Sequence, residues 1–377
     1  MRRTDSSLLA CQLLLALAVL LSLGSAAAAA ENAYIRKNLV SDVPGAAQHT
    51  DSHLVNPWGI AFNPFGFVWI ADNGKNVSTL YDGKGNPQSL VVTIPDGKPT
   101  GIVFNGAFSL PGNTDFLVTS GNNSAPAAFL FATENGIVAG WSPLVSPTSA
   151  IEAFRSKEGA IFKGLAFASD GTNRFLYATD FHNGKIVVLN SRFEEVSLVA
   201  GAFSDPNLPA NYAPFGIQNL NGNLYVTYAL QDADKEDDVR CAGCGFVDVF
   251  TPAGVLIERF ASRGALNAPW GLTIAPARFG KFSGRLLVGN FGDGRISAYD
   301  LAAGDFKGQL RQTNGQLLRI DGLWGLSFGN GLQKQFVNVL FFTAGPNNEQ
   351  HGLYGRISPA PLSTDTDAAG QLDSGDL

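Results

Sequence analysis

Acidic and amide side chains recur at matched positions, each directly after a short apolar run. Asp72 and Asn73 follow VWIA, Asp180 follows LYAT, and Asn290 follows LLVG. Calcium takes six to eight oxygen ligands, so these residues are candidate metal or polar-ligand groups if they converge on one point. The same residue types also shape tight turns, through side-chain hydrogen bonds to the backbone and tolerance of positive φ. Both readings, a calcium or polar-ligand site and structural turns, stay open.

Two further features could carry chemistry. His182 follows the second of these runs and is a weak candidate for a catalytic general base, although a solitary histidine also serves turns and packing. The segment 231–238, QDADKEDD, is the most charged stretch, but it lacks the glycine and the closing glutamate of an EF-hand loop, so we predict a solvated loop. The sequence contains no H-E-x-x-H motif.

The first thirty residues resemble a secretory signal peptide. Arg2 and Arg3 precede an almost wholly apolar run over 8–23, and alanines occupy 26–30. The alternative is a membrane anchor, for which this run is short. We therefore predict a signal peptide at 1–30, a secreted, extracellular protein, and no membrane span in the remainder. In a eukaryotic secretory pathway, the sequons at Asn76 and Asn122 would be glycosylation sites.

Secretion changes the interpretation of the cysteines. Cys241 and Cys244 form a C-A-G-C motif, which in a cytosolic protein would suggest redox chemistry or half of a zinc site. The four histidines are scattered along the chain, and disulfides are common in secreted proteins. We predict a local disulfide between the two cysteines.

The composition favours short strands over helices and excludes one class of partner. Of the 377 residues, 45% are hydrophobic and only 15% charged, with 43 glycines and 27 phenylalanines. The net charge is -6, and no basic stripe is present, which argues against nucleic-acid binding.

A repeated unit must position the candidate residues. The stretch PWGIAF around Gly59 has relatives around five later glycines: Gly101, Gly164, Gly216, Gly271 and Gly325. Each is followed by a second and a third apolar run. The second runs are 67–72, 115–120, 174–179, 223–228, 285–290 and 338–343, and fourth runs are visible at 89–94, 196–201, 255–260 and 316–320. Six such units predict an all-β, six-bladed β-propeller of four-stranded blades.

The register of the repeat assigns roles to its first residues and to the chain ends. We expect the glycine to lie against the central channel, where a side chain would collide with the next blade, and the aromatic residue before it to wedge between blades. The sixth unit lacks a fourth run, and residues 33–40 precede the first unit, so this N-terminal strand is predicted to close the ring. The predicted propeller domain is 31–357, and the acidic tail 358–377 is expected to be disordered.

These motifs together resemble an uncharacterised secreted family of NHL-type six-bladed propellers. The resemblance rests on PWGIAF with VWIADNG, on LYATDFHNGKI, and on PWGLTIAP with LLVGNFGDGRI, and it covers 34–357. The architecture is more distantly similar to gluconolactonases and paraoxonases, which hold calcium in the central channel; this similarity is one of fold alone. This similarity implies calcium as a candidate cofactor, and the sequence establishes no cofactor.

Two functions follow as expectations. The first is a monomeric binding or interaction module for an extracellular protein or glycan. The alternative is a calcium-dependent hydrolase or lyase with its site at the mouth of the channel. Acids and amides lining the channel would favour the enzyme, whereas an apolar plug would favour the binding module.

Overall fold

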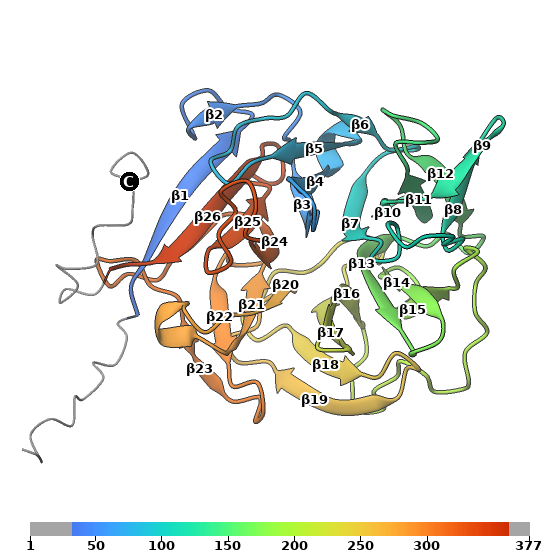
Figure 1. The fold of residues 1–377 in the computed structure, drawn as a ribbon. Helices are drawn as coiled ribbons and strands as arrows, with labels where there is room; N and C mark the ends of the chain where they lie inside the picture. Colours follow the sequence, from blue (N-terminus) through green and yellow to red (C-terminus); the bar gives the residue numbers. More distant parts are fainter. Residues whose placement is uncertain (1–31, 362–377) are drawn as a thin grey trace, which may run out of the picture. The chain divides into compact units, whose positions relative to one another are not determined.

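The computed structural model describes residues 32–361, which form a ring of β-sheets around a central channel (Figure 1). Six blades follow one another in chain order, which confirms the predicted all-β six-bladed propeller. Besides the strands, the described part contains two short 3-10 helices, η1 (Asn73–Lys75) and η2 (Gly280–Phe282). Within residues 32–361, no helix is long and apolar enough to cross a membrane.

The first three blades occupy the N-terminal half of the ring. Blade 1 contains β3 (Pro57–Phe62), β4 (Val68–Asp72), β5 (Val77–Tyr81) and β6 (Val92–Thr93). Blade 2 contains β7 (Pro99–Phe104), β10 (Phe129–Thr133), β11 (Ile137–Trp141) and β12 (Ile151–Arg155), with a separate hairpin of β8 (Leu117–Ser120) and β9 (Asn123–Pro126). In the described part of the chain, blade 3 contains three strands, β13 (Phe162–Ser169), β14 (Arg174–Asp180) and β15 (Lys185–Leu189).

The last three blades complete the ring. Blade 4 contains β16 (Tyr212–Leu220), β17 (Asn223–Leu230), β18 (Phe246–Phe250) and β19 (Leu256–Ser262). Blade 5 contains β20 (Pro269–Ile274), β21 (Leu286–Asn290), β22 (Ile296–Tyr299) and β23 (Phe306–Gln309). Blade 6 contains β24 (Leu323–Phe328), β25 (Leu340–Ala344) and β26 (Leu353–Pro359), followed by β1 (Tyr34–Ser41) and the short β2 (His49–Thr50).

The N-terminal strand closes the ring, as predicted. β1 pairs antiparallel with β26, from Tyr34 opposite Pro359 to Ser41 opposite Leu353. β26 runs two residues beyond the boundary predicted for the tail. The predicted signal peptide and the tail beyond residue 361 lie outside the described residues.

The repeated glycine has the role expected from its position. A Cβ atom at Gly59 would lie 2.5 Å from the carbonyl oxygen of Thr100 in the next blade, and one at Gly216 would lie 2.1 Å from that of Trp270. Only glycine allows the innermost strands to approach this closely. The inter-blade core lies farther out, where Trp69 of blade 1 stacks on Phe129 of blade 2 with ring centroids 4.1 Å apart.

The predicted second strand of blade 2 was wrong. Residues 115–120 belong mostly to the inserted hairpin, and the second strand is β10, which pairs with both β7 and β11. The turn between β10 and β11 contains Asn135 and Gly136, the latter at φ +68°. An Asn-Gly pair between two apolar runs is a strong hairpin signal, so this turn could have located the blade.

Two predicted fourth strands were also wrong. In blade 5 the outer strand is β23, and 316–320 contributes only isolated bridges. In blade 3 the run 196–201 forms no strand, and the outer edge of β15 keeps a single bridge, from Leu189 to Glu195. The other two predictions hold, since β6 lies within 89–94 and β19 overlaps 255–260.

Candidate functional site

One face of the ring is closed by an aromatic cluster, which we call the aromatic plug: Trp58, Phe181, Phe215, Trp270, Phe291 and Trp324. The inner strands begin and the second strands end at this face, because the paired strands are antiparallel. Trp58 stacks on Trp324 at a centroid distance of 3.6 Å and meets Trp270 edge-on at 6.2 Å. We had expected these aromatic residues to wedge between adjacent blades. Blades 1 and 5 are not neighbours, so the contact of Trp58 with Trp270 shows that the tryptophans also fill the channel opening.

A buried cation lies against the aromatic plug. The Lys163 side chain is 1% exposed, and its Nζ atom lies 2.6 Å from Glu134 Oε1, 2.9 Å from Asp237 Oδ1 and 5.2 Å from the Trp58 ring centroid. Burial opposes the charge, but the two carboxylates outweigh it, so the pKa of Lys163 is raised. Sequence reasoning missed this lysine, which occupies the position before a repeated glycine where four of the other five units have an aromatic residue.

Amide side chains link the Lys163 ion pairs into a hydrogen-bond network across blades 1, 2 and 6. Asn56 Nδ2 donates to Asn73 Oδ1 at 3.3 Å and to Glu349 Oε2 at 2.9 Å, while Asn73 Nδ2 donates to Glu134 Oε2 at 3.1 Å. Trp324 Nε1 donates to Asn56 Oδ1 at 3.1 Å. Of the predicted ligand residues, Asn73 therefore lies in a central polar network, where its hydrogen bonds join loops of different blades.

The acidic segment 231–238 folds back over this face. Its residues 233–237 are exposed as predicted for a solvated loop, yet Asp237 binds Lys163 and Asp238 is partly buried. Burial raises the pKa of Asp238 to about 7, because it outweighs the opposing effects of Arg240 and Lys163. Asp238 Oδ2 has no hydrogen-bond partner within the described part of the chain. Arg240 in turn lies over the Phe291 ring, 4.4 Å from its centroid.

The other three predicted ligand residues serve local loops. Asp72 is fully buried and accepts a 2.7 Å hydrogen bond from Thr79 Oγ1; burial raises its pKa well above the usual range. Asp180 accepts hydrogen bonds from the backbone and the side chain of Asn183, at 3.2 and 2.8 Å. Asn290 accepts from the Asn267 backbone and donates to Ala265 O.

None of these partners belongs to the central network. Over residues 32–361, no group of three or more His, Cys, Asp or Glu side chains is arranged to hold a metal ion. The geometry of Asp180 and Asn290 matches what turns require.

The remaining predicted residues lie outside the network. The His182 ring is half-buried, and its Nδ1 atom has no partner among the described residues. Cys241 and Cys244 form the predicted disulfide, with their Cα atoms 5.3 Å apart. Asn76 and Asn122 are both exposed, Asn122 at the tip of the β8–β9 hairpin, and their glycosylation stays a prediction.

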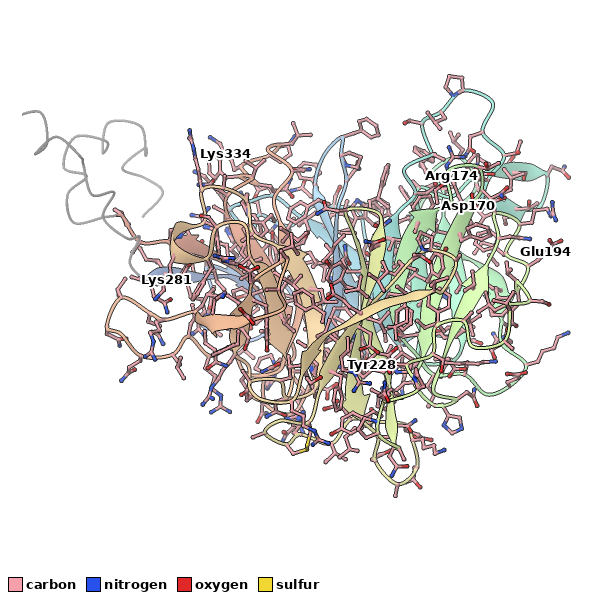
Figure 2. All side chains as sticks on the ribbon, turned by 90° about the horizontal axis from the view of Figure 1, so that it is seen from below. Asp170, Arg174, Glu194, Tyr228, Lys281 and Lys334 are labelled. Carbon is pink, nitrogen blue, oxygen red and sulfur yellow. A yellow bond between two sulfur atoms is a disulfide. The ribbon has the colours of Figure 1, made fainter. Side chains whose placement is uncertain are left out.

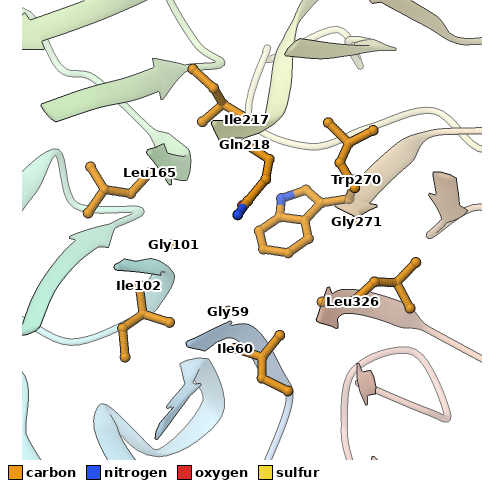
Figure 3. A pocket seen from close by; sticks show the side chains of 12 residues that line it. Gly59, Ile60, Gly101, Ile102, Leu165, Ile217, Gln218, Trp270, Gly271 and Leu326 are labelled. Carbon is orange, nitrogen blue, oxygen red and sulfur yellow. The ribbon is translucent and has the colours of Figure 1, made fainter. Parts of the chain in front are cut away.

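The channel behind the aromatic plug is narrow and mainly aliphatic. Its free volume is about 30 Å³, and Ile60, Ile102, Leu165, Leu326 and the repeated glycines line it (Figure 3). Gln218 supplies a polar side chain that points into this space beside Trp270. The lining of the channel is therefore apolar except for this one amide.

At the opposite face the channel widens into an open depression, which we call the channel mouth. It has a volume of about 470 Å³ and is lined mainly by Ile60, Phe62, Phe104, Phe167, Gln218 and Asn219. An apolar groove of about 320 Å³ adjoins it, shares Phe104 and carries Phe65, which is 65% exposed. Gln218 and Asn219 replace the apolar pair that the inner strands of blades 1, 2 and 3 have at these positions, and blade 4 alone has two amides there, a signal that sequence reasoning missed.

Comparison with known proteins supports the fold and identifies relatives. No protein-family model matches the chain. The solved structure of a streptogramin B lyase superimposes with a TM-score of 0.50 at 15% identity, covering 87% of this chain and 97% of the lyase, which shows similarity of fold alone. Two uncharacterized proteins of Acanthamoeba polyphaga mimivirus are much closer in sequence. R648 is 36% identical over 332 residues, covering 85% of this chain and 78% of its own length.

The second relative, L690, is 34% identical over 333 residues, covering 85% of this chain and 84% of its own length. The matches span most of both partners, so the shared unit is the whole propeller rather than a single blade. On this evidence of sequence, the chain belongs to the same protein family as R648 and L690 of Acanthamoeba polyphaga mimivirus.

Proposed function

We propose that the protein is a secreted NHL-type propeller that binds an extracellular glycan or protein at the channel mouth. The observation that carries the proposal is the asymmetry of the channel, which is closed at one face by the aromatic plug and open at the other as a depression of about 470 Å³. Ligand sites are typically concave and mostly apolar, with a few polar groups that fix orientation. The apolar N-terminal segment and the disulfide support secretion.

The lining of the channel mouth favours a neutral ligand, and among extracellular molecules a glycan. Its residues are aliphatic, aromatic, amide or hydroxyl, and none carries a charge. Phe62, Phe104 and Phe167 offer apolar surface to the C–H groups of a sugar ring. Gln218 is exposed, and its amide both donates and accepts hydrogen bonds, as recognition of sugar hydroxyls requires.

A glycan array probed with the purified chain lacking residues 1–30 tests this proposal. We expect binding to a neutral glycan class, and Gln218→Ala should weaken it about tenfold, since one hydrogen bond to a buried partner is lost. Gln350→Ala, at an exposed position on the plugged face, is the matched control and should bind like the wild type. Equal binding by both variants would reject the channel mouth as the site.

A hydrolase or lyase acting at the plugged face is the second candidate. The observation that favours it is Asp238, whose carboxyl has a pKa of about 7 and an oxygen without a partner in residues 32–361. A carboxyl that titrates near neutral pH suits general acid–base catalysis. Elemental analysis for calcium, with ester and lactone turnover compared between wild type and Asp238→Asn, tests this candidate. Turnover that is equal in both proteins would exclude Asp238 as the catalytic group.

A further inference from the structure

Within residues 32–361, blade 3 lacks the outer strand that every other blade has. The outer position is occupied by β6, β12, β19, β23 and β1 in blades 1, 2, 4, 5 and 6, whereas β15 is the last strand of blade 3. The chain after β15 continues as a loop along the outside of the ring (Figure 1). An unpaired strand edge presents backbone groups that can pair with another chain.

The chain leaves this edge because it is anchored to blade 4. Its last backbone hydrogen bond to β15 runs from Val196 N to Val188 O, at 2.8 Å. Farther along, Phe203 N donates to Gly254 O at 2.8 Å, and Asp205 forms an ion pair with Arg259 of β19. Residues 197–204 therefore bow away from β15 toward blade 4, and they cannot pair with the edge.

The part of the edge without a backbone partner among the described residues is centred on Ile186, which lines the edge as a residue only 5% exposed. In an antiparallel ladder, the residues of one strand turn their N–H and C=O groups alternately to its two sides. Because Val188 O points to the outer side, the N–H and C=O of Ile186 point there too. Within residues 32–361, the bonds from this side of β15 reach only the 194–196 segment, which leaves Ile186 unpaired on this side.

An open cavity of about 520 Å³ lies beside this edge. Ile186 and Val188 form one wall, and Leu198, Phe203, Leu208 and Tyr228 contribute the apolar part of the other walls. Leu198, which lines the cavity, is 38% exposed, and its sequence neighbour Val199 is 76% exposed. The backbone edge and the apolar cavity thus lie side by side, which is the arrangement that strand addition uses: main-chain bonds supply affinity and side-chain pockets supply specificity.

The charges around the cavity indicate a cationic ligand. Lys185 is neutralised by Glu158, with Nζ and Oε2 2.5 Å apart, and Asp205 is paired with Arg259. Glu195 lines the cavity and is exposed. The pKa of Lys185 is raised mainly by its hydrogen bond with Glu158, and the charge of Glu195 adds to this rise, but the ammonium forms its ion pair with Glu158 rather than with Glu195. A lysine or arginine on an incoming strand would therefore find an available carboxylate at the edge.

We propose that the open edge of β15 binds an extended peptide segment of a partner protein as the fourth strand of blade 3. The peptide bonds through its backbone to Ile186, places an apolar side chain in the cavity against Phe203 and Tyr228, and places a basic side chain opposite Glu195. This site lies at the rim of the ring, and it is separate from the channel mouth.

Fluorescence anisotropy with a labelled eight-residue peptide of alternating lysine and valine tests the proposal. We expect saturable binding to the chain lacking residues 1–30. Two N-methylated peptides probe the backbone bonds: one methylated at every lysine, the other at every valine. Only one set of N–H groups can face β15, so one peptide should bind about tenfold more weakly or worse, and the other should bind like the parent. Equal binding of both methylated peptides, or no binding of the parent, would overturn the proposal.

Protein variants locate the binding site. Ser197→Trp fills the cavity from an exposed position and should abolish peptide binding. Ser89→Trp, at an exposed position on blade 1, is the matched control and should leave peptide binding unchanged. Glu195→Lys should weaken the lysine peptide more than a serine–valine peptide. Binding that survives Ser197→Trp would reject this site. A concentration-dependent dimer of the protein alone that Ser197→Trp disrupts would assign the edge to a second copy instead.

Discussion

Lys163 Nζ of blade 3 lies 2.6 Å from Glu134 Oε1 of blade 2, in a position where the lysine side chain is almost wholly removed from solvent. The same ammonium contacts Asp237 of blade 4 and lies over Trp58 of blade 1. One buried cation thus joins four blades at the plugged face. Figure 2 shows all described side chains on the ring, turned by 90° from the view of Figure 1. This contact predicts where the ring is most sensitive to substitution.

Replacing Lys163 by methionine should lower the free energy of unfolding by about 3–5 kcal/mol, because it leaves Glu134 without its charge partner in a mostly buried place. Chemical denaturation measures the change. The double variant Lys163→Met/Glu134→Gln should recover part of the loss, and Lys75→Met, at an exposed position, should change stability little. A loss no larger than that of Lys75→Met would show that the buried pair contributes no net stability.

Removing the hydroxyl of Tyr34 should loosen the closure of the ring. This hydroxyl donates to Phe279 O at 3.0 Å and accepts from Phe282 N at 3.3 Å, so β1 is tied to blade 5 as well as blade 6. We expect Tyr34→Phe to lower the free energy of unfolding by about 1–3 kcal/mol, since both buried backbone groups lose a partner. Chemical denaturation measures the change.

Deleting residues 31–42 removes most of β1, exposes the edge of β26 and should cause aggregation. An unchanged melting temperature in the deletion variant would contradict closure through β1.

Asp238 should make stability fall as the pH rises. Its pKa is about 7 in the folded chain, above the ordinary value of 3.8, so the folded protein binds more protons than the unfolded chain between these values. The free energy of unfolding therefore decreases from about pH 4 to about pH 7, and the penalty is complete above pH 7. Asp238→Asn should flatten this slope and raise the melting temperature at pH 8 relative to wild type.

Part of the slope should remain in that variant, because burial also raises the pKa of Asp248 to about 7, with Asp205 adding to it and Arg259 opposing it. Melting curves of both proteins from pH 4 to pH 8 give the comparison. Parallel pH profiles for wild type and Asp238→Asn would contradict the assigned pKa.

Asp180→Asn separates a turn residue from a calcium ligand. The carboxylate accepts its hydrogen bonds from Asn183 and from Ile161 N, and an asparagine oxygen can keep the backbone bonds. We expect the melting temperature to change by only a few degrees and to show no dependence on calcium in either protein. A calcium-induced rise in the wild type that is lost in Asp180→Asn would instead show a bound ion.

The disulfide between Cys241 and Cys244 should contribute modestly to stability. It closes a very short loop, for which the chain-entropy model gives about 2 kcal/mol or less. The double variant Cys241→Ser/Cys244→Ser should therefore stay folded, with a small decrease in melting temperature. Intact mass with and without reductant and alkylation checks the bond in the secreted protein, and two free thiols would count against it.

Several features could be predicted from the sequence because they depend on local contacts. The glycine of each unit meets the backbone of the next blade wherever the inner strands crowd, so it repeats with the blades, as at Gly59 and Gly216. Short apolar runs and the turn residues that bound them are also visible in a local stretch of sequence, which is why most second strands were located correctly. The closing strand followed from counting, since the sixth unit had three runs and residues 33–40 had no partner. The error in blade 2 arose because the inserted hairpin carries a short apolar run, like that of a blade strand.

The site depends on contacts between residues that are far apart in the chain. Nothing near Lys163 in the sequence indicates that Glu134 and Asp237 will neutralise it, and Trp58 meets Trp324 only because the ring closes. The unpaired edge of β15 likewise depends on where a distant segment lies, since the chain after this strand bonds to blade 4 through Phe203 and through the ion pair of Asp205 with Arg259. The sequence by itself determined the number of blades and the strands that begin them, since these follow from local sterics and alternation. Only the tertiary structure decided which face is closed, which charges are buried and which edge stays open, because burial and pairing are properties of the assembled ring.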